Sequence, residues 1–305
     1  MIRYVLLLIT LLLPASLYAQ PSLPQSGTDK SVTNLRDQIE KIAQAAQGRV
    51  GVSATVIETG ESVALRGDEQ FPMQSVYKFP IGMTALHLVD QGKLSLTQTI
   101  HVKPAEYVSE RQHSPLRDKN PHGADVTLDE LLRYAVSESD GSASDVLMRL
   151  VGGPQVIMNY LKSFGVTGII VANTEKEIGG DNAVQYRNWA KPNEIVELLK
   201  ALQNGLGLST SSRARLFRLM TNTQTGLKRL KGLLPAGTVV AHKTGTSWTI
   251  DGVTAATNDV GLITLPNGHH MAIAVFVSDA KADESTREGV IAKIAQAAWN
   301  TWNNP

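Results

Sequence analysis

Cysteine is absent from this chain of 305 residues. Its absence excludes a disulfide framework, a thiol nucleophile, a thiolate metal site and a lipid anchor attached to a cysteine. A protein without disulfides depends on its hydrophobic core for stability. A chain of this length can bury roughly three quarters of the surface that it exposes when unfolded.

Long hydrophobic runs are confined to the start of the chain, MIRYVLLLITLLLPASLYAQ. One positive charge, Arg3, precedes an apolar run from Val5 to Leu13, and small or neutral residues then lead to Ala19. The run is far shorter than the roughly 20 apolar residues that cross a bilayer. The pattern predicts a secretory signal peptide over residues 1–19, cleaved after Ala19. We therefore expect a periplasmic protein with no membrane anchor after cleavage.

An excess of charge of one sign is also absent. Without the leader, the 29 basic side chains become 28, which equals the 28 acidic ones. Nucleic acids and anionic membranes bind proteins with a basic excess, so neither partner is expected. The histidines form no pattern of metal ligands, since His269 and His270 are adjacent on a predicted strand and point to opposite faces. We expect no metal, no cofactor and a monomer.

Periodicity of the apolar residues locates the main elements. A helix is predicted over 31–47, and strands follow at 49–58 and 61–67. Helical spacing dominates the middle of the chain, in segments 76–91, 128–138, 143–151, 154–164, 192–204 and 210–221. Strands return at 238–247, 255–266 and 269–279, with Asn267-Gly268 as a tight turn, and a final helix closes the chain.

Strands at both ends, with helices between them, predict a two-lobe α/β fold. One antiparallel sheet is built from both chain termini and flanked by helices, and an all-helical lobe is inserted. We assign residues 20–305 to a single catalytic domain, with an α/β lobe of 31–70 and 224–305 and a helical lobe of 71–223. The cleft between the lobes is the expected site. Two stretches without periodicity, 101–126 and 168–190, are long for plain connections, and we expect them to shape it.

The stretch FPMQSVYKFP (71–80) places Ser75 three residues before Lys78. On a helix this spacing puts both side chains on one face, where the amine could take the proton of the serine hydroxyl. A lysine acting as a base near neutral pH needs its pKa lowered by roughly 3 units from about 10.4, through burial or a cationic neighbour. The same pattern recurs by chance at Ser278–Lys281, so the spacing alone leaves the assignment open.

Two further stretches carry possible chemistry. HKTGTS (242–247) combines the positive charge of Lys243 with hydroxyl donors and a glycine that lets a ligand approach the backbone, which suits an anion. An ordinary strand with a solvated lysine is the alternative. In AVSESDGSASD (135–145), Ser139 lies between predicted helices and could pass a proton to a second lysine. Ser-Asp pairs are also common helix caps, and Ser144-Asp145 matches equally well.

The order and spacing of these elements carry more weight than any one of them. SVYK, followed 64 residues later by SDG and a further 104 later by KTG, resembles the class A serine β-lactamases. The resemblance covers essentially the whole mature chain. It implies that Ser75 attacks the β-lactam carbonyl to form an acyl-enzyme and that Lys78 takes part in activating it. It also implies that Ser139 relays a proton to the departing ring nitrogen.

The resemblance implies a substrate-binding strand and a deacylating glutamate as well. The residues implied to bind the substrate are Lys243, Thr244, Gly245, Thr246 and Ser247, supported by Arg229. The backbone N–H groups of Ser75 and Thr246 are implied to stabilise the oxyanion. The glutamate belongs on the irregular loop 168–190, where Glu175 fits the spacing of the family and Glu177 is the second choice.

This chain departs from the usual family pattern at several positions. Gly141 and Gly179 stand where asparagines are usual, and Asn173 with Asn188 stands where many relatives pair an arginine with an aspartate. FPMQSVxKFP, VSESD and HKTGTS resemble a divergent extended-spectrum branch, which implies a broad site that accepts bulky cephalosporins.

Other members of the wider class share part of this pattern. The implied function is hydrolysis of penicillins and cephalosporins, and hence antibiotic resistance, with β-lactam substrates and inhibitors as the ligands. A D,D-peptidase or a penicillin-binding sensor domain would share Ser75, Lys78 and the KTG strand but would release β-lactams very slowly. A glutamate at position 175 favours the hydrolase.

Overall fold

A six-stranded antiparallel sheet lies at the centre of the protein in the computed structural model, which describes residues 27–303. The strand order is β2-β1-β11-β10-β8, and β9 pairs with β10. Two strands come from the N-terminal part and four from the C-terminal part: β1 (Arg49–Val56), β2 (Ser62–Leu65), β8 (Val240–Thr246), β9 (Thr249–Ile250), β10 (Val253–Thr264) and β11 (His270–Ala280). Since β1 pairs with β11 from Arg49↔Ser278 to Val56↔Met271, the predicted sheet built from both ends of the chain is confirmed.

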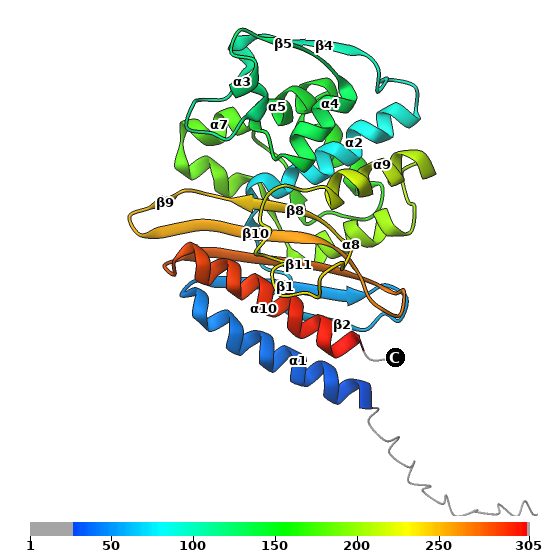
Figure 1. Cartoon of the computed structure of the whole chain (residues 1–305), viewed down its shortest axis with the longest axis vertical. Helices are drawn as coiled ribbons and strands as arrows, with labels where there is room; N and C mark the ends of the chain where they lie inside the picture. Colours follow the sequence, from blue (N-terminus) through cyan, green and yellow to red (C-terminus); the bar gives the residue numbers. More distant parts are fainter. Residues whose placement is uncertain (1–26, 304–305) are drawn as a thin grey trace, which may run out of the picture.

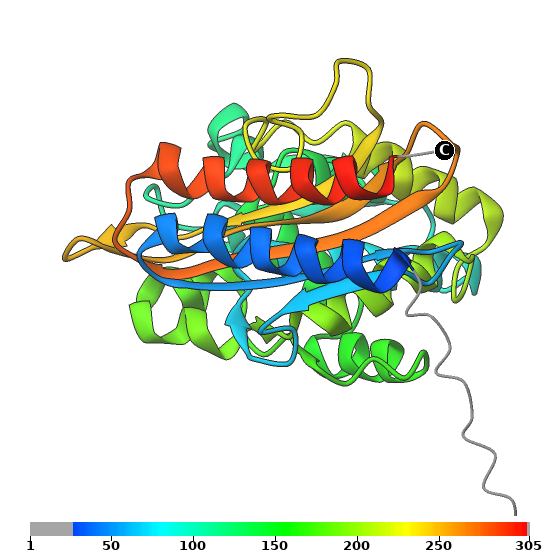
Figure 2. The same cartoon turned by 90° about the horizontal axis from the view of Figure 1, so that it is seen from below.

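Helices cover both faces of this sheet (Figures 1 and 2). On one face, α1 (Gly27–Ala43) and α10 (Glu284–Trp302) lie side by side. On the other face, α8 (Pro192–Gln203) packs against β1 and β11, and α9 (Thr210–Thr221) packs against β8. Alternate residues of β11 enter different cores, with Phe276 among the helices of the middle of the chain and Val275 with α1 and α10. Burial of both faces explains why β11 is apolar almost throughout.

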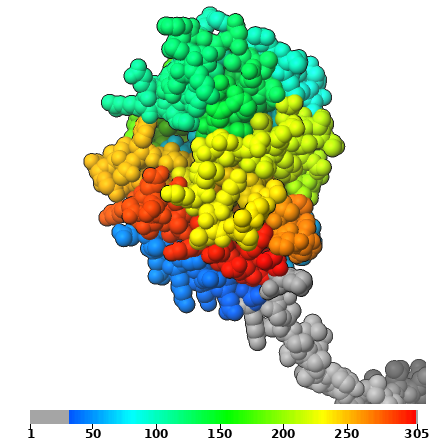
Figure 3. Space-filling model, viewed as in Figure 1, coloured from blue at the N-terminus to red at the C-terminus, as the bar shows by residue number. Residues whose placement is uncertain are grey.

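The middle of the chain is mainly helical, as predicted, and forms a layer beside the sheet (Figure 1), whose green surface lies at the top of Figure 3. The helix expected over 128–138 is divided into α4 (Leu128–Leu132) and a π-helical turn, η4 (Arg133–Ser137). The other helices and 3-10 turns are α2 (Lys78–Asp90), α3 (Pro115–Lys119), α5 (Gly141–Leu150), α6 (Pro154–Lys162), α7 (Glu175–Gly180), η1 (Gln44–Ala46), η2 (Gln74–Tyr77), η3 (Pro104–Glu106) and η5 (Asn182–Arg187). The limits of the two lobes stay a prediction.

The two stretches expected to be irregular contain short elements. The first overlaps a hairpin of β4 (Thr99–Val102) and β5 (Ala124–Thr127). The second contains α7, η5, β6 (Ile169–Ile170) and β7 (Trp189–Ala190). Because β7 also pairs with β3 (Phe71–Pro72), this second stretch is tied to the backbone just before Ser75.

The signal peptide predicted over residues 1–19 lies outside the described residues. Within residues 27–303, none of the helices combines the length and the apolar character needed to cross a membrane.

Gly51 on β1 allows the segment that carries Ser75 to rest on the sheet. A Cβ at this position would lie 2.3 Å from the ring of Phe71, which is fully buried and packs against Phe276. The missing side chain therefore makes room for Phe71, four residues before Ser75.

We predict that Gly51→Ala destabilises the protein, by about 1–3 kcal/mol, because the buried ring has no free space into which to move. Gly289→Ala on α10 is the matched control, since a Cβ there meets nothing within 4 Å. This control should be neutral or up to about 1 kcal/mol more stable, through better helix propensity. Urea unfolding measures both, and equal stability of the two variants would contradict the role of Gly51.

Candidate active site

Ser75 and Lys78 meet at the junction of η2 and α2. The Lys78 Nζ lies 2.8 Å from Ser75 Oγ and donates a second hydrogen bond of 2.8 Å to the carbonyl oxygen of Ser139. The Lys78 side chain is almost completely buried. Gln74, just before Ser75, has a φ of 47°, which is uncommon for a residue other than glycine. Its amide donates to buried Gln185 on η5, which fixes this unusual backbone.

Glu175, the first residue of α7, reaches the same two side chains. Its Oε1 lies 2.8 Å from Lys78 Nζ and 3.3 Å from Ser75 Oγ. Burial acts to raise the pKa of Glu175, but the Lys78 ammonium and its hydrogen bond outweigh burial, so the pKa lies below its ordinary value. The exposed Glu177 instead accepts hydrogen bonds from the N–H and hydroxyl groups of Thr174, in a capping box of α7. This geometry favours Glu175 as the functional carboxylate.

The segment around Glu175 is held at both ends by buried or partly buried side chains. Asp145 on α5 accepts hydrogen bonds from the backbone N–H groups of Glu175, at 2.7 Å, and Lys176, at 3.0 Å. Asn188 accepts from two successive backbone N–H groups and donates to the carbonyl of Asn173. One asparagine that binds backbone thus does the work expected of an arginine–aspartate pair.

Ser139 lies between the two predicted lysines. Its carbonyl accepts from Lys78, and its hydroxyl accepts a hydrogen bond of 2.8 Å from Lys243 Nζ. Burial and the positive charge of Lys78 lower the pKa of Lys243 well below its ordinary value. Asp140 caps the start of α5, so this loop combines the expected helix cap with the expected proton relay geometry.

Strand β8 brings its KTG segment directly beside η2. A Cβ on Gly245 would lie 2.3 Å from the carbonyl oxygen of Met73, so this approach requires glycine. Asn258 on β10 binds the same backbone, donating to the carbonyls of Pro72, at 2.8 Å, and Met73, at 3.1 Å. The end of β8 is thereby fixed next to the Ser75 N–H.

Arg229 lies behind β8, where it is 3% exposed. Its guanidinium donates to the carbonyls of Gly245 and Asn258 and, at 2.8 Å, to the hydroxyl of Thr246. Glu288 of α10 neutralises its other side, with 3.1 Å between Nε and Oε1. The arginine therefore reaches the predicted substrate-binding strand through Thr246.

Two predicted substrate contacts already have protein partners. The hydroxyl of Thr244 is bonded to that of Thr225, and the hydroxyl of Ser247 accepts from the N–H of Ala256. The Thr246 hydroxyl also has a partner, Arg229, but its side chain is exposed at the edge of the site.

Part of this set faces a cleft with a volume of about 260 Å³, whereas Lys243, Thr244, Gly245 and Arg229 are not among its lining residues. It is lined by both loop stretches, η2 and the end of β8, through Gln74, Ser75, Lys78, Arg111, Gln112, His113, Ser139, Glu175, Ile178, Asn182, Gln185, Thr246, Ser247 and Trp248. Within residues 27–303, no cluster of three or more His, Asp or Glu side chains is arranged to hold a metal ion.

Sequence reasoning missed Asp145, Gln112 and Trp248. Asp145 belongs to a Ser-Asp pair that reads as a chance match. The sequence signal that could have identified Asp145 was its position one helical turn after Gly141, on the same face of the helix. Gln112 lies in a stretch expected to shape the site, but no local pattern singles it out. Trp248 follows the HKTGTS stretch and is 49% exposed, where it forms one wall of the cleft.

The two glycines that replace the usual asparagines both face the loop 107–113. A Cβ on Gly141 would lie 3.3 Å from the carbonyl oxygen of His113 and from Val108. A Cβ on Gly179 would lie 2.2 Å from Oε1 of Gln112. This loop therefore occupies space that side chains at 141 and 179 would need.

Burial and the nearby carboxylate of Glu175 raise the pKa of Asp145 to about 7, despite its two bonds to backbone N–H groups. The folded protein therefore holds this proton more tightly than the unfolded chain. The resulting stabilisation is present below about pH 4 and is lost as the pH rises to about 7; it amounts to at most about 4 kcal/mol.

We predict that Asp145→Asn removes this fall in the free energy of unfolding with rising pH. Urea unfolding across the range, with the exposed Asp37→Asn as control, tests this; an unchanged slope in Asp145→Asn would contradict it.

Comparison with known proteins places this chain in a family. The sequence profile of the Beta-lactamase enzyme family matches residues 34–302. The chain is 43% identical over 265 residues to the extended-spectrum beta-lactamase PER-1 of Pseudomonas aeruginosa, covering 87% of this chain and 86% of that protein. It is 39% identical over 273 residues to beta-lactamase VEB-1 of the same organism, covering 89% of this chain and 91% of that protein.

Solved structures agree with the sequence relatives. A beta-lactamase from Chitinophaga pinensis is similar with a TM-score of 0.85 and 46% identity, covering 88% of this chain and 98% of that one. The TLA-1 extended-spectrum beta-lactamase gives a TM-score of 0.87 at 42% identity, covering 90% and 100% of the two chains. At this level of identity and coverage, the similarity spans most of the chain and is not confined to the three motifs. The chain belongs to the beta-lactamase enzyme family, among its class A serine members.

Proposed function

We propose that this β-lactamase opens the ring of penicillins and cephalosporins through an acyl-enzyme on Ser75. One observation carries the proposal: the Ser75 hydroxyl lies in the cleft, 2.8 Å from the amine of Lys78 and 3.3 Å from the carboxylate of Glu175. A serine needs such a neighbouring base to become nucleophilic.

In the first step, Ser75 Oγ attacks the carbonyl carbon of the ring and gives its proton to Glu175, or to Lys78 after the Lys78 ammonium has passed its own proton to the Glu175 carboxylate 2.8 Å away. The N–H groups of Ser75 and Thr246 stabilise the negative charge on the carbonyl oxygen. The bond between carbonyl carbon and ring nitrogen then breaks, and Ser139 supplies its hydroxyl proton to that nitrogen. The proton taken from Ser75 is passed on to restore the Ser139 hydroxyl, so that Glu175 is ionised again before the second step. Lys243 supports this transfer, because its amine contacts the Ser139 hydroxyl and its own pKa is lowered.

The second step hydrolyses the ester. Glu175 takes a proton from a water molecule, the resulting hydroxide attacks the ester carbonyl, and Ser75 is released with its proton restored. The lowered pKa of Glu175 suits this role, because a general base must be ionised at neutral pH.

The substrate carboxylate is held at the end of β8. Lys243 and Thr246 provide the direct contacts, with Thr244, Gly245 and Ser247 forming the rest of the strand and Arg229 adding positive charge behind it. Trp248 and the loop 107–113 form the walls beside the acyl side chain, which supports a site for bulky, extended-spectrum cephalosporins.

The setting of the enzyme is also part of the proposal. We propose an exported, periplasmic monomer, cleaved after Ala19, whose cleft lies between the lobe of 31–70 with 224–305 and the lobe of 71–223. β-Lactam inhibitors would bind the same cleft, and antibiotic resistance is the biological outcome. A D,D-peptidase or penicillin sensor is not favoured, because the matched relatives are beta-lactamases.

We predict that Ser75→Ala lowers turnover of a chromogenic cephalosporin by at least ~10³-fold, because no other hydroxyl takes its place.

Glu175→Gln should still form the covalent adduct and release it ~10²–10⁴-fold more slowly, so that mass spectrometry detects the adduct on Ser75. Glu177→Gln is the control and should turn over normally. If the Glu177 variant accumulates the adduct and the Glu175 variant releases it normally, Glu177 and not Glu175 carries out deacylation, which would contradict the proposal.

We predict that Arg229→Leu raises KM about 10-fold for a cephalosporin with a free carboxylate, by removing a positive charge behind the binding strand. The exposed Arg218→Ala on α9 is the control. A cephalosporin ester that lacks this negative charge should bind wild type and Arg229→Leu alike. If the variant loses affinity equally for acid and ester, Arg229 acts through the fold and not through the carboxylate.

A further inference from the structure

Gln112 carries a buried carboxamide that is bonded at both ends. Its Oε1 accepts hydrogen bonds from the Ser109 N–H, at 3.3 Å, and from the Ser109 hydroxyl, at 3.0 Å. Its Nε2 donates to the backbone carbonyl of Glu175. The side chain is 8% exposed and lines the cleft. A side chain from the first loop therefore holds the backbone of the glutamate on the second loop.

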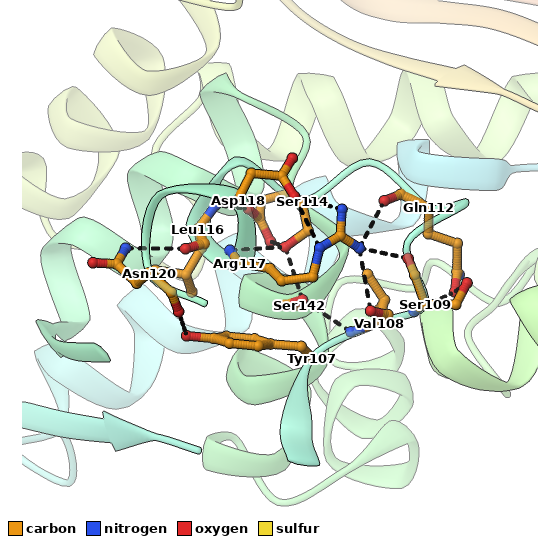
Figure 4. Close-up of polar contacts among 11 residues, drawn as sticks. Tyr107, Val108, Ser109, Gln112, Ser114, Leu116, Arg117, Asp118, Asn120 and Ser142 are labelled. Atoms are coloured by element: carbon orange, nitrogen blue, oxygen red, sulfur yellow. Dashed lines mark hydrogen bonds and ion pairs between the residues drawn. The ribbon is translucent and has the colours of Figure 1, made fainter. Parts of the chain in front are cut away.

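The turn that presents Gln112 is itself fixed by Arg117 (Figure 4). One guanidinium nitrogen of Arg117 donates to the carbonyl oxygens of Val108, Ser109 and Gln112. Asp118 accepts from its other nitrogens. Binding three carbonyls of one turn leaves Gln112 little freedom to change position.

Gly179, one helical turn after Glu175 on α7, is complementary to Gln112. A Cβ on Gly179 would lie 2.2, 2.4 and 2.6 Å from Oε1, Cδ and Nε2 of Gln112. The carboxamide thus occupies the space that opens only when residue 179 lacks a side chain. Gly179 and Gln112 form one packing unit, although they belong to different loops.

The backbone of Glu175 is consequently hydrogen-bonded on both sides of its Cα. Asp145 accepts from its backbone N–H, and Gln112 donates to its backbone carbonyl. Ser75 and Lys78 lie on η2 and α2, and the hydrogen bonds of the Gln112 side chain go to Ser109 and Glu175 and to neither of these two residues. Loss of the Gln112 contact should therefore disturb the glutamate more than the nucleophile.

We propose that Gln112 is a positioning residue for Glu175, and that Gly179 exists to admit its carboxamide. The inference rests on the proposed role of Glu175 in deacylation. Its consequence is selective: displacement of Gln112 slows release of the acyl group and affects formation of the acyl-enzyme less. A shift of about 1 Å in a catalytic group can lower a rate ~10²-fold.

Gln112→Glu is the sharpest test, because it keeps the size of the side chain but replaces the donor that binds Glu175. We expect deacylation to fall at least ~10-fold relative to acylation. The acid limb of the deacylation rate should also move to higher pH, because a new negative charge raises the pKa of Glu175. Stopped-flow acylation and decay of the adduct by mass spectrometry measure both steps in the full chain. The exposed Gln91→Glu is the matched control.

A double-mutant cycle tests the packing unit. Gln112→Ala and Gly179→Ala should each slow deacylation, and the double variant should be no slower than the worse single one, because one lost contact underlies both effects. Thermal unfolding identifies any variant that fails to fold, and Gln112→Glu then stands alone as the test.

The outcomes separate this inference from the proposed function. A wild-type protein that is acylated without turning over would refute the role of Glu175 itself. If the wild-type protein turns over normally, a Gln112→Glu variant that deacylates at the wild-type rate, with an unshifted acid limb, would overturn the inference. Equal losses of acylation and deacylation, or additive effects in the cycle, would overturn it as well.

Discussion

The buried ammonium of Lys78 is the interaction on which the rest of this enzyme depends. It bonds to the Ser75 hydroxyl, the Ser139 carbonyl and the Glu175 carboxylate, each at 2.8 Å. A buried charge without partners costs several kcal/mol, so these three segments are stable only when assembled around it. The contact that we propose to activate the serine also joins η2, the loop before α5 and α7. Folding and chemistry therefore impose the same constraint on this residue.

The binding strand is held by a second set of contacts that come from the opposite side. Gly245 allows β8 to touch the backbone before Ser75, Asn258 bonds to that backbone, and Arg229 fixes the carbonyl of Gly245. In the proposed mechanism, the nucleophile is thus positioned by the helical middle of the chain and the substrate by the C-terminal strands. The cleft is the seam between these two sets of contacts, which explains why its lining residues are scattered through the sequence.

The sequence predicted those parts of the fold and the site that depend on short local patterns of residues. The spacing of Ser75 and Lys78 is a property of one helical turn, and the terminal strands alternate clearly enough to give the sheet. Glu175 was selected over Glu177 by family spacing, and the contacts now give a physical reason, since the carboxylate of Glu177 is used to cap α7. Asp145 and Gln112 could not be found in this way, because each acts on the backbone of a distant segment. A dipeptide such as Ser144-Asp145 looks the same whether or not another loop approaches it.

The pairing of β1 with β11 has a consequence for how much of the chain must be present before the site can form. Without residues 253–280, one edge of β1 has no neighbour and β8 has no strand to hold it beside η2. The segment that carries Ser75 therefore gains the strand beside it only when the C-terminal part of the chain has joined the sheet. A chain truncated before β11 would expose the unpaired edge of β1, which favours aggregation or proteolysis.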